Sequence, residues 1–235
     1  MKNIYFFMTL CAVVILSACN SDDDVPVVAP SERGVVVDDM GNSYGWVRIG
    51  DLDWTTSNAM NGPGCYDATY EGNWGPENVF DPRYSQYAFM RDEYIPAYGN
   101  LMSYDDAIES APEGWRLPSD EDWKNLERAL GMKDPDNLGW RGDGILPVLT
   151  SKESGSQLGL RFGGGIIRKQ SYGMLNLTFL FFKEYGYFWT STVDPKNQDD
   201  PMAYFRKIVF GVDGVERQAG SQQYLLSVRW CRDAK

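Results

Sequence analysis

The sequence predicts an α+β fold in which two helices pack on a short-stranded antiparallel sheet with long irregular loops. Two observations lead to this class. Two capped helical segments lie in the middle of the chain, and short apolar runs separated by glycine turns fill the last third. Helices segregated from strands along the chain are typical of α+β domains.

The composition excludes several classes of function. The chain has 235 residues, 43% hydrophobic and 14% aromatic, which is enough to bury a core. Its 22 basic and 33 acidic residues give a net charge of −11, and we expect no nucleic-acid partner because phosphate neutralisation needs Lys and Arg. The chain has no histidine, so His-dependent triads, HExxH zinc sites and histidine pH switches are excluded.

Residues 1–18 have the pattern of a signal peptide, with a basic start and a short apolar run. The run ends in Leu-Ser-Ala before Cys19, which resembles the bacterial lipobox, where the cysteine becomes the lipidated first residue of the mature protein. We therefore expect Cys19 to carry lipid and to attach the chain to a membrane. The alternative is an ordinary signal peptide followed by a chance cysteine.

Two further cysteines, Cys65 and Cys231, would remain in the mature chain. In an oxidising compartment they could form a disulfide, or they could be two separate buried thiols. The sequence gives no distance between them, and both alternatives stay open.

Residues 19–34 are expected to form an acidic flexible tether, because they are polar and interrupted by proline. The triplet Asp22, Asp23 and Asp24 resembles the surface-export signal of Bacteroidota lipoproteins, and the alternative is a solvated linker. The resemblance implies an outer-membrane lipoprotein exposed at the cell surface. No linker interrupts residues 35–235, so we expect a single domain there.

The domain begins with two predicted short strands within residues 44–54. Trp46 and Arg48 alternate with Val47 and Ile49, and a turn is expected at residues 51–53.

Residues 61–98 combine many Gly and Pro residues with many aromatic rings. Because Gly and Pro disfavour long regular elements while aromatic rings need a surface to pack on, we expect an irregular folded insertion. Its rings are candidate ligand contacts, and the alternative is that they pack internally. The candidates are Tyr66, Tyr70, Trp74, Tyr84 and Tyr87. The segment is acidic, which favours neutral or cationic partners.

Two helices are predicted from their capping signals. Ser103 and Ser119 each precede an acidic first turn, which suits the helix dipole. The first helix is expected to run to about Ala111. The second carries three apolar residues on one face: Trp123, Leu126 and Leu130.

The last third predicts five strands, at residues 158–162, 174–182, 187–192, 203–210 and 224–232. Turns are expected at the glycine triplet 163–165 and at Asp213-Gly214, the latter as a hairpin.

Four segments together resemble the Fibrobacter succinogenes major paralogous domain, found in surface lipoproteins of Bacteroidota and relatives. They are YGWVRIGDLDWTTSNA at 44–59, YGNLMSYDDAIESAPEGWRLPSDEDW at 98–123, GYFWTST at 186–192 and YLLSVRWCRD at 224–233. The resemblance covers nearly all of residues 35–235. It implies a C-type lectin-like fold, related to formylglycine-generating enzymes, with its termini paired at one end and its loops away from them.

Within such a fold we expect core positions for four residues: Trp115, Leu117, Trp189 and Trp230. The alternative for Trp189 and Trp230 is that either ring stacks on a sugar. The sugar-binding triplets of lectins and the reactive cysteine pair of formylglycine-generating enzymes are not found in this sequence. A loop that starts like a calcium site at Asp134 has Leu138 and Ile145 where ligands are needed. We therefore expect no cofactor, no metal and no enzymatic activity.

The sequence thus favours a surface-anchored recognition module for a glycan or protein ligand, attached to the membrane through its N-terminal lipid. The alternative is a structural or adhesive subunit of a surface assembly with no small-molecule ligand. Unpaired strand edges and exposed apolar patches would favour this alternative. The sequence does not define the oligomeric state.

Overall fold

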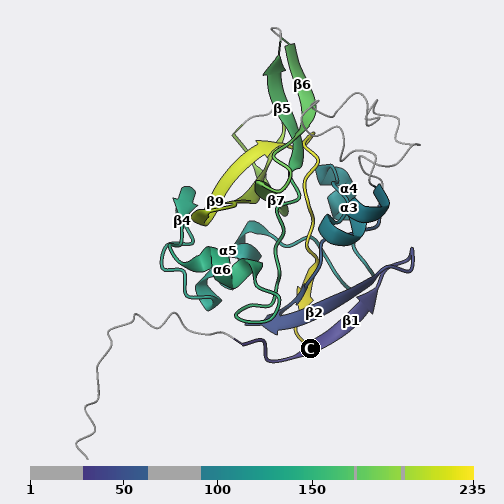
Figure 1. The fold of residues 1–235 in the computed structure, drawn as a ribbon, viewed down its shortest axis with the longest axis vertical. Helices are drawn as coiled ribbons and strands as arrows, with labels where there is room; N and C mark the ends of the chain where they lie inside the picture. The colour runs from purple at the N-terminus through teal and green to yellow at the C-terminus, as the bar shows by residue number, and fades with distance from the viewer. Residues whose placement is uncertain (1–28, 63–90, 172–173, 197–198) are drawn as a thin grey trace, which may run out of the picture.

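The computed structural model describes residues 29–62, 91–171, 174–196 and 199–235 (Figure 1). Within these ranges it contains helices and three antiparallel sheets, so the predicted α+β class is confirmed. Four helices are present within the described ranges, where the sequence had predicted two.

The first sheet brings the two ends of the described chain together. Its strand order is β1-β2-β3-β10, with bounds Arg33–Val37, Ser43–Ile49, Leu52–Thr55 and Cys231–Asp233. All three pairings in this sheet are antiparallel. We call it the terminal sheet. Figure 1 shows β1, β2 and the C-terminus together at one end of the molecule.

The strands at the start of the domain differ slightly from the prediction. β2 and β3 form as expected, but their turn lies at residues 50–51 rather than 51–53. β1 was not predicted. It begins at Arg33, and hydrogen bonds to Arg48 already hold Ser31 and Glu32, so the ordered domain starts before residue 35.

The second sheet forms the centre of the molecule, with strand order β4-β9-β8-β7. The bounds are Gly139–Arg141, Val212–Ser221, Met202–Val209 and Tyr185–Asp194. The hairpin β8–β9 was predicted, but its turn is Phe210–Gly211 instead of Asp213-Gly214. Gly211 supplies the positive φ of 76°. Gly214 instead allows β9 to approach β4 closely, because a Cβ at this position would lie 2.8 Å from the Arg141 carbonyl oxygen.

The third sheet is a two-stranded hairpin of β5, Gly165–Ser171, and β6, Met174–Leu180. It projects from the end of the molecule opposite the C-terminus (Figure 1). β5 was not predicted, because the glycine triplet 163–165 had been assigned to a turn.

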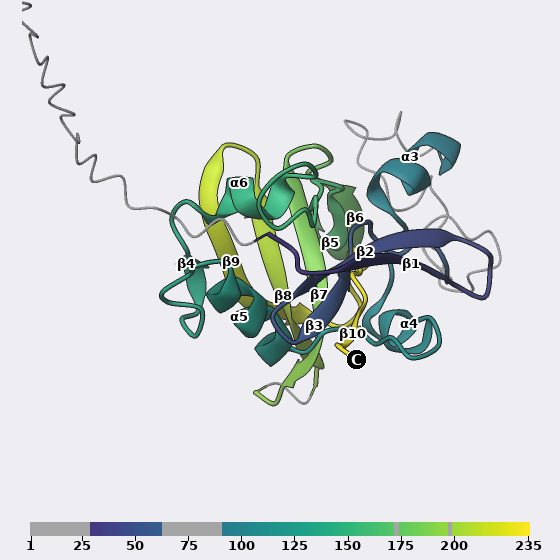
Figure 2. The same cartoon turned by 90° about the horizontal axis from the view of Figure 1, so that it is seen from below.

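The helices lie on two sides of the central sheet. Figure 2 shows α5, Asp120–Ala129, and α6, Ile145–Thr150, on one side. It shows α3, Arg91–Tyr98, and α4, Tyr104–Glu109, on the other. α4 and α5 confirm the two predicted helices. α6 was not predicted, and α3 corrects the expectation of irregular structure across residues 61–98.

The helix α3 forms despite Pro96 in its last turns, and tertiary packing explains this. Tyr94 is buried, and its hydroxyl donates to the Gly163 carbonyl oxygen at 2.6 Å. The rings of Tyr98 and Phe182 lie 4.9 Å apart. These contacts fix α3 beside the base of the β5–β6 hairpin.

The capping signals that predicted α4 and α5 are both present. The Ser103 hydroxyl accepts from the Asp106 backbone N–H, and Ser119 forms a capping box with Asp122. The predicted apolar face of α5 is buried, at 1–2% exposure for Trp123, Leu126 and Leu130. The four predicted core residues Trp115, Leu117, Trp189 and Trp230 are buried as well.

Two predicted strands of the last third are largely wrong. Residues 158–162 are not a strand, because Gly159 takes a positive φ of 59° and its N–H donates to Ser151 beside α6. The predicted strand 224–232 is a strand only at its end, where β10 covers Cys231–Asp233. Residues 224–230 make only isolated bridges, to Met102, Ile166 and Phe188. Residues 224–230 therefore contact three separate parts of the fold and do not form a continuous strand of one sheet.

Candidate functional site

Most of the predicted site residues lie outside the described residues. These are Cys19, Cys65, Tyr66, Tyr70, Trp74, Tyr84 and Tyr87. The structure therefore does not place the lipidation site or the candidate ligand-binding rings.

Cys231 is described, and it is a free, buried thiol. Burial raises the pKa of this thiol, although the neighbouring Arg116 guanidinium lies 3.1 Å from its sulfur and acts in the opposite direction. A thiol with a raised pKa is a poor nucleophile. Of the two alternatives left open by the sequence, the structure shows Cys231 without a disulfide.

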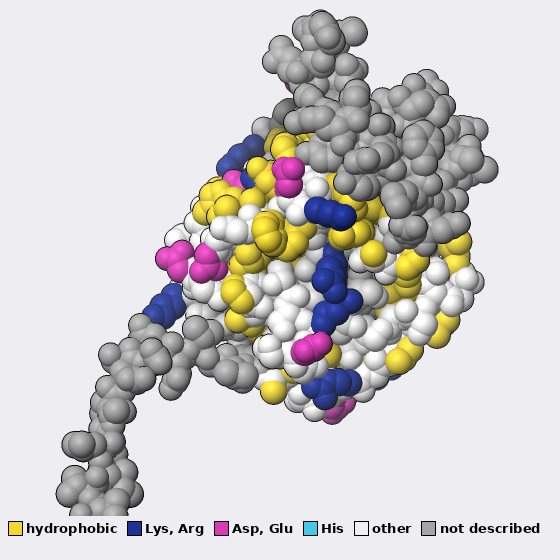
Figure 3. Space-filling view, viewed as in Figure 1, with side chains coloured by type: hydrophobic (Ala, Val, Ile, Leu, Met, Phe, Trp, Pro, Cys, Tyr) yellow, Lys and Arg dark blue, Asp and Glu magenta, His cyan; other side chains and the backbone are white. Residues whose placement is uncertain are grey.

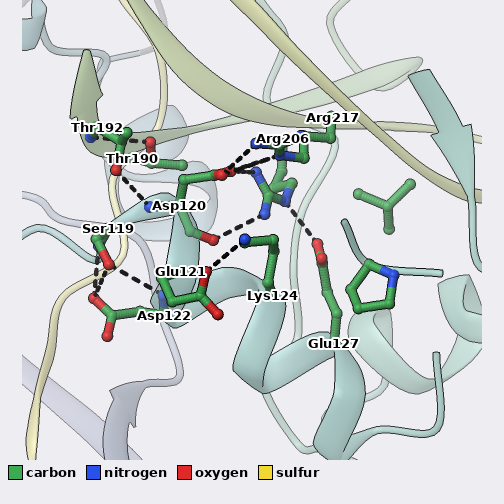
Figure 4. Close-up of polar contacts among 12 residues, drawn as sticks. Ser119, Asp120, Glu121, Asp122, Lys124, Glu127, Thr190, Thr192, Arg206 and Arg217 are labelled. Carbon is green, nitrogen blue, oxygen red and sulfur yellow. Dashed lines mark hydrogen bonds and ion pairs between the residues drawn. The ribbon is translucent and has the colours of Figure 1, made fainter. Parts of the chain in front are cut away.

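The most concentrated chemistry in the described part of the chain is a buried network of charges between α5 and the central sheet (Figure 4). We call it the α5 charge network. It contains two carboxylates and three guanidinium groups: Asp120, Glu127, Arg141, Arg206 and Arg217.

Glu127 is the centre of this network. Its side chain accepts a bond from Arg206 Nε at 2.6 Å and another from Arg141 Nη2 at 2.6 Å. All three residues are at most 4% exposed. The remaining Arg141 nitrogens donate to the backbone carbonyls of Pro135 and Val215.

Asp120, the first residue of α5, binds the other guanidinium groups. Arg206 Nη1 donates to Asp120 Oδ1 at 2.6 Å, and Arg217 reaches both carboxylate oxygens at 2.6–3.0 Å. The Asp120 backbone N–H donates to the Thr192 hydroxyl at 2.9 Å, as Figure 4 shows. The start of α5 is thus tied to β7, β8 and β9 at once.

These contacts decide what Asp120 can do chemically. Burial by itself raises the pKa of this carboxyl, but the hydrogen bonds and charges of Arg217 and Arg206 outweigh burial and lower the pKa. A carboxylate with a lowered pKa and guanidinium partners on both oxygens is a poor general base or acid near neutral pH. The α5 charge network therefore has the character of a structural clamp.

The sequence analysis did not find this network, although one signal was present. Arg206 and Ile208 lie two residues apart in β8, so they share a face of the strand. Both are fully buried. A buried charged side chain is most often paired with an opposite charge, and the acidic first turn of α5 supplies a carboxylate for Arg206.

The segment that starts like a calcium loop at Asp134 makes ion pairs with α5. Asp136 pairs with Lys124 and Arg128 on α5, at 3.0 and 2.9 Å. Among the described residues, no group of three or more Cys, Asp or Glu is arranged to hold a metal ion.

A groove of about 710 Å³ lies beside the terminal sheet, between the β2–β3 turn and α5. Its lining carries the carboxylates of Asp51, Asp122 and Asp233. Trp54 also lines it, and the buried indole N–H of Trp54 has no acceptor among the described residues. The groove is acidic, and it lies beside the sheet that contains both the first and the last described strands.

Exposed apolar side chains gather in two places on the described surface. Val35, Val37 and Met40 are exposed on and just after β1. Trp140, Phe210 and Val212 are exposed on the central sheet around β4, β9 and the β8–β9 turn. Lys207 lies over the Trp140 ring at 5.3 Å, so that ring is partly covered by a cation.

Comparison with known proteins gives one result. No curated protein and no solved structure matches the chain. None of the helices in the described ranges is long and apolar enough to cross a membrane. The Fibrobacter succinogenes major domain matches residues 47–232, which span both the α5 charge network and the Cys231 end. The chain therefore belongs to the Fibrobacter succinogenes major domain family.

Proposed function

We propose that this protein is an outer-membrane lipoprotein of the cell surface whose domain is a recognition module for a glycan or protein ligand. We further propose that the domain is related to C-type lectin-like folds. The observation that carries the proposal is the separation of the two ends of the domain. Both terminal strands, β1 and β10, lie in one sheet, and the β5–β6 hairpin projects from the opposite end (Figure 1).

This arrangement suits a domain held at one end. Hydrogen bonds between Ser31 N and Arg48 O and between Arg48 N and Glu32 O begin the folded part within the last residues of the expected tether, 19–34. A lipid on Cys19 would then hold the terminal sheet towards the membrane and leave the hairpin end pointing outward.

The chain also holds both flanks of residues 63–90, the segment with the candidate rings. On one side, Asn61 Nδ2 donates to the Ser110 carbonyl oxygen at 2.7 Å, and Asn100 Nδ2 donates to the Gly62 carbonyl oxygen at 3.0 Å. On the other side α3 is fixed by Tyr94. Binding residues concentrate in segments that a rigid scaffold displays, so this placement supports a recognition role.

The charges of the described residues support binding over catalysis. The buried carboxylates of the α5 charge network are paired with guanidinium groups, and burial raises the pKa of the Cys231 thiol.

An array of glycans and glycoproteins tests the proposal, with the unlipidated chain of residues 20–235 as probe. We expect saturable binding to a restricted set of neutral or cationic ligands. Failure to bind any member of the array at micromolar concentrations would contradict the recognition role.

A structural or adhesive role is the second candidate, and the edge strand β1 favours it. Among the described residues β1 pairs only with β2, and its outer residues Val35 and Val37 are exposed. An open, apolar strand edge is a template for pairing with another chain.

The double variant Val35→Lys, Val37→Lys tests this role, because lysine on an edge strand blocks pairing. An adhesive subunit would self-associate in sedimentation experiments, and the double variant would be monomeric. Phe210→Lys, which changes an exposed apolar residue of the other sheet, is the matched control. A wild-type chain that is already monomeric at every concentration tested would exclude self-assembly through β1.

A further inference from the structure

A small pocket lies where four distant segments of the chain meet. It is formed by residues 56–58 after β3, by the end of α3, by the loop after α6 and by Arg229 near the C-terminus. Its enclosed volume is about 20 Å³, which is room for about one water-sized group. Three cationic residues line it, Lys152, Arg161 and Arg229, and its lining contains no Asp or Glu.

Arg229 is held rigidly at this pocket. It is 1% exposed, and Nε donates to Asn58 Oδ1 at 2.6 Å. Nη1 donates to the carbonyl oxygens of Thr55 and Leu158, and Nη2 donates to that of Gly159. A guanidinium has five N–H donors, and these bonds use four of them. The fifth, on Nη2, has no acceptor among the described residues.

The loop after α6 brings Lys152 close to the same guanidinium. A Cβ on Gly159 would lie 2.6 Å from Lys152 Cγ, so the lysine stem packs directly on Gly159. The carbonyl oxygen of Gly159 accepts the bond from Arg229 Nη2 at 3.0 Å. Gly159 therefore contacts both the lysine stem and the buried guanidinium, and it has a positive φ of 59°, which glycine adopts readily.

The charges at this pocket are not compensated. Within the described part of the chain, neither Lys152 nor Arg161 makes an ion pair, and Arg229 donates only to neutral oxygens. In the α5 charge network, by contrast, every arginine contacts a carboxylate. An uncompensated buried charge is costly, and the chain as a whole is acidic.

The neighbouring charges also affect each other's protonation. Burial, together with the smaller effect of the Arg161 charge, lowers the pKa of Arg229 to about 9. Burial, followed by the charges of Arg161 and Arg229, lowers the pKa of Lys152. A guanidinium with a pKa near 9 is still a cation at neutral pH, so an anion would relieve the mutual repulsion.

We propose that Lys152, Arg161 and Arg229 form a binding site for the carboxylate group of a ligand. A carboxylate is planar and small enough for one oxygen to enter the narrow pocket, whereas tetrahedral sulfate and phosphate are bulkier. The free Nη2 proton of Arg229 is a buried donor for that oxygen. Lys152 and Arg161 line the same pocket and supply two further positive charges, and Ser57 is also among its lining residues.

The pocket shares only Pro96 and Ala97 of α3 with the candidate segment 61–98, and its three cationic residues lie outside that segment. The proposed site therefore does not depend on the proposed recognition function. Figure 3 shows Lys and Arg side chains gathered in a column over the middle of one face of the molecule. The chain has a net charge of −11, so the cationic lining of the pocket is a local attraction for an anionic ligand.

Thermal unfolding of the full chain in detergent, followed by tryptophan fluorescence at pH 7, tests this site with acetate as the probe. Sodium acetate is titrated against sodium chloride at constant ionic strength. We expect the unfolding midpoint to rise with acetate and to saturate. Arg161→Gln and Lys152→Gln should each need about tenfold more acetate for the same rise, because each removes one charged donor.

Lys133→Gln is the matched control, because Lys133 is exposed and is not among the residues that line the pocket. It should respond to acetate like the wild type. Arg161→Gln should also raise the midpoint in chloride alone, because it removes repulsion from Arg229, and this readout is independent of any ligand. An equal acetate response in all four proteins would overturn the site. A response to sulfate at lower concentration than to acetate would overturn its assignment to carboxylates.

Discussion

At the scale of single residues, buried arginines organise this domain. Arg206 joins Asp120 and Glu127, which lie two turns apart on α5, and Arg229 ties the segments after β3 and α6 to the C-terminal segment. Each donates to several acceptors in a fixed fork, which lysine could not do. The two arginines differ in their partners. Arg206 is paired with carboxylates, whereas Arg229 donates only to neutral oxygens.

Glu127→Gln should lower the free energy of unfolding by about 3–5 kcal/mol, because it leaves the buried guanidinium groups of Arg141 and Arg206 without this charge partner. Urea denaturation measures this loss. The matched control is Glu121→Gln, whose carboxylate is largely exposed on the same helix and pairs with Lys124 and Arg128. It should cost at most about 1 kcal/mol. Equal losses in the two variants would contradict the clamp role of Glu127.

The pH dependence of stability follows from Asp120. Its folded-state pKa is lowered, so its contribution is fully present above its unfolded pKa of about 3.9 and is lost as pH falls through the folded value. We expect the unfolding free energy of the wild type to fall below about pH 4. In Asp120→Asn this acid loss should be smaller, as measured by urea denaturation between neutral pH and pH 2.5. An unchanged acid slope would show that Asp120 titrates normally.

At the scale of elements, local signals succeed where a helix carries its own caps. Ser119 and Asp122 form the capping box of α5, and the apolar spacing of its buried face was readable in the sequence. Residues 158–162 and 224–230 read as strands from their apolar content. Their conformation depends instead on Gly159 and on hydrogen bonds to three different elements, which no local pattern encodes.

Ser119→Ala should lower the unfolding free energy by about 0.5–2 kcal/mol, because it removes the acceptor for the Asp122 backbone N–H. Thermal or urea unfolding measures the effect. Ser31→Ala changes an exposed serine that contributes only its backbone N–H to Arg48, and it is the control. If Ser31→Ala were as destabilising as Ser119→Ala, the cap would not explain the loss.

At the scale of the whole molecule, the terminal sheet joins the two ends of the domain, as the resemblance of the sequence implied. The family could also be predicted from the sequence motifs that carry the resemblance. These motifs lie in β2, β3, α4, the start of α5 and the buried C-terminal end. The proposed carboxylate pocket could not be predicted from the sequence. Arg229, Lys152 and Arg161 are brought together only by the tertiary fold, and the candidate rings of residues 63–90 lie outside the described residues.

Cys19→Ser should abolish lipid labelling and membrane fractionation, since the lipid on that residue is the proposed anchor. Metabolic labelling with a fatty acid measures this change. Replacing Asp22, Asp23 and Asp24 with Ala is the companion variant, which should stay lipidated but become inaccessible to protease on intact cells. If the Cys19→Ser protein still partitions with outer membranes, the lipoprotein proposal is wrong.

We propose that the domain binds its ligand through the rings of residues 63–90. This proposal is tested by comparing the ligand affinities of two tryptophan variants. The dissociation constant of an array-selected ligand is measured for the wild type, Trp74→Ala and Trp140→Ala, the last being a change at an exposed ring on β4. We expect Trp74→Ala to weaken binding by about 1–3 kcal/mol and Trp140→Ala to leave it unchanged. Unchanged binding by a folded Trp74→Ala protein, or loss of binding in Trp140→Ala alone, would contradict the account.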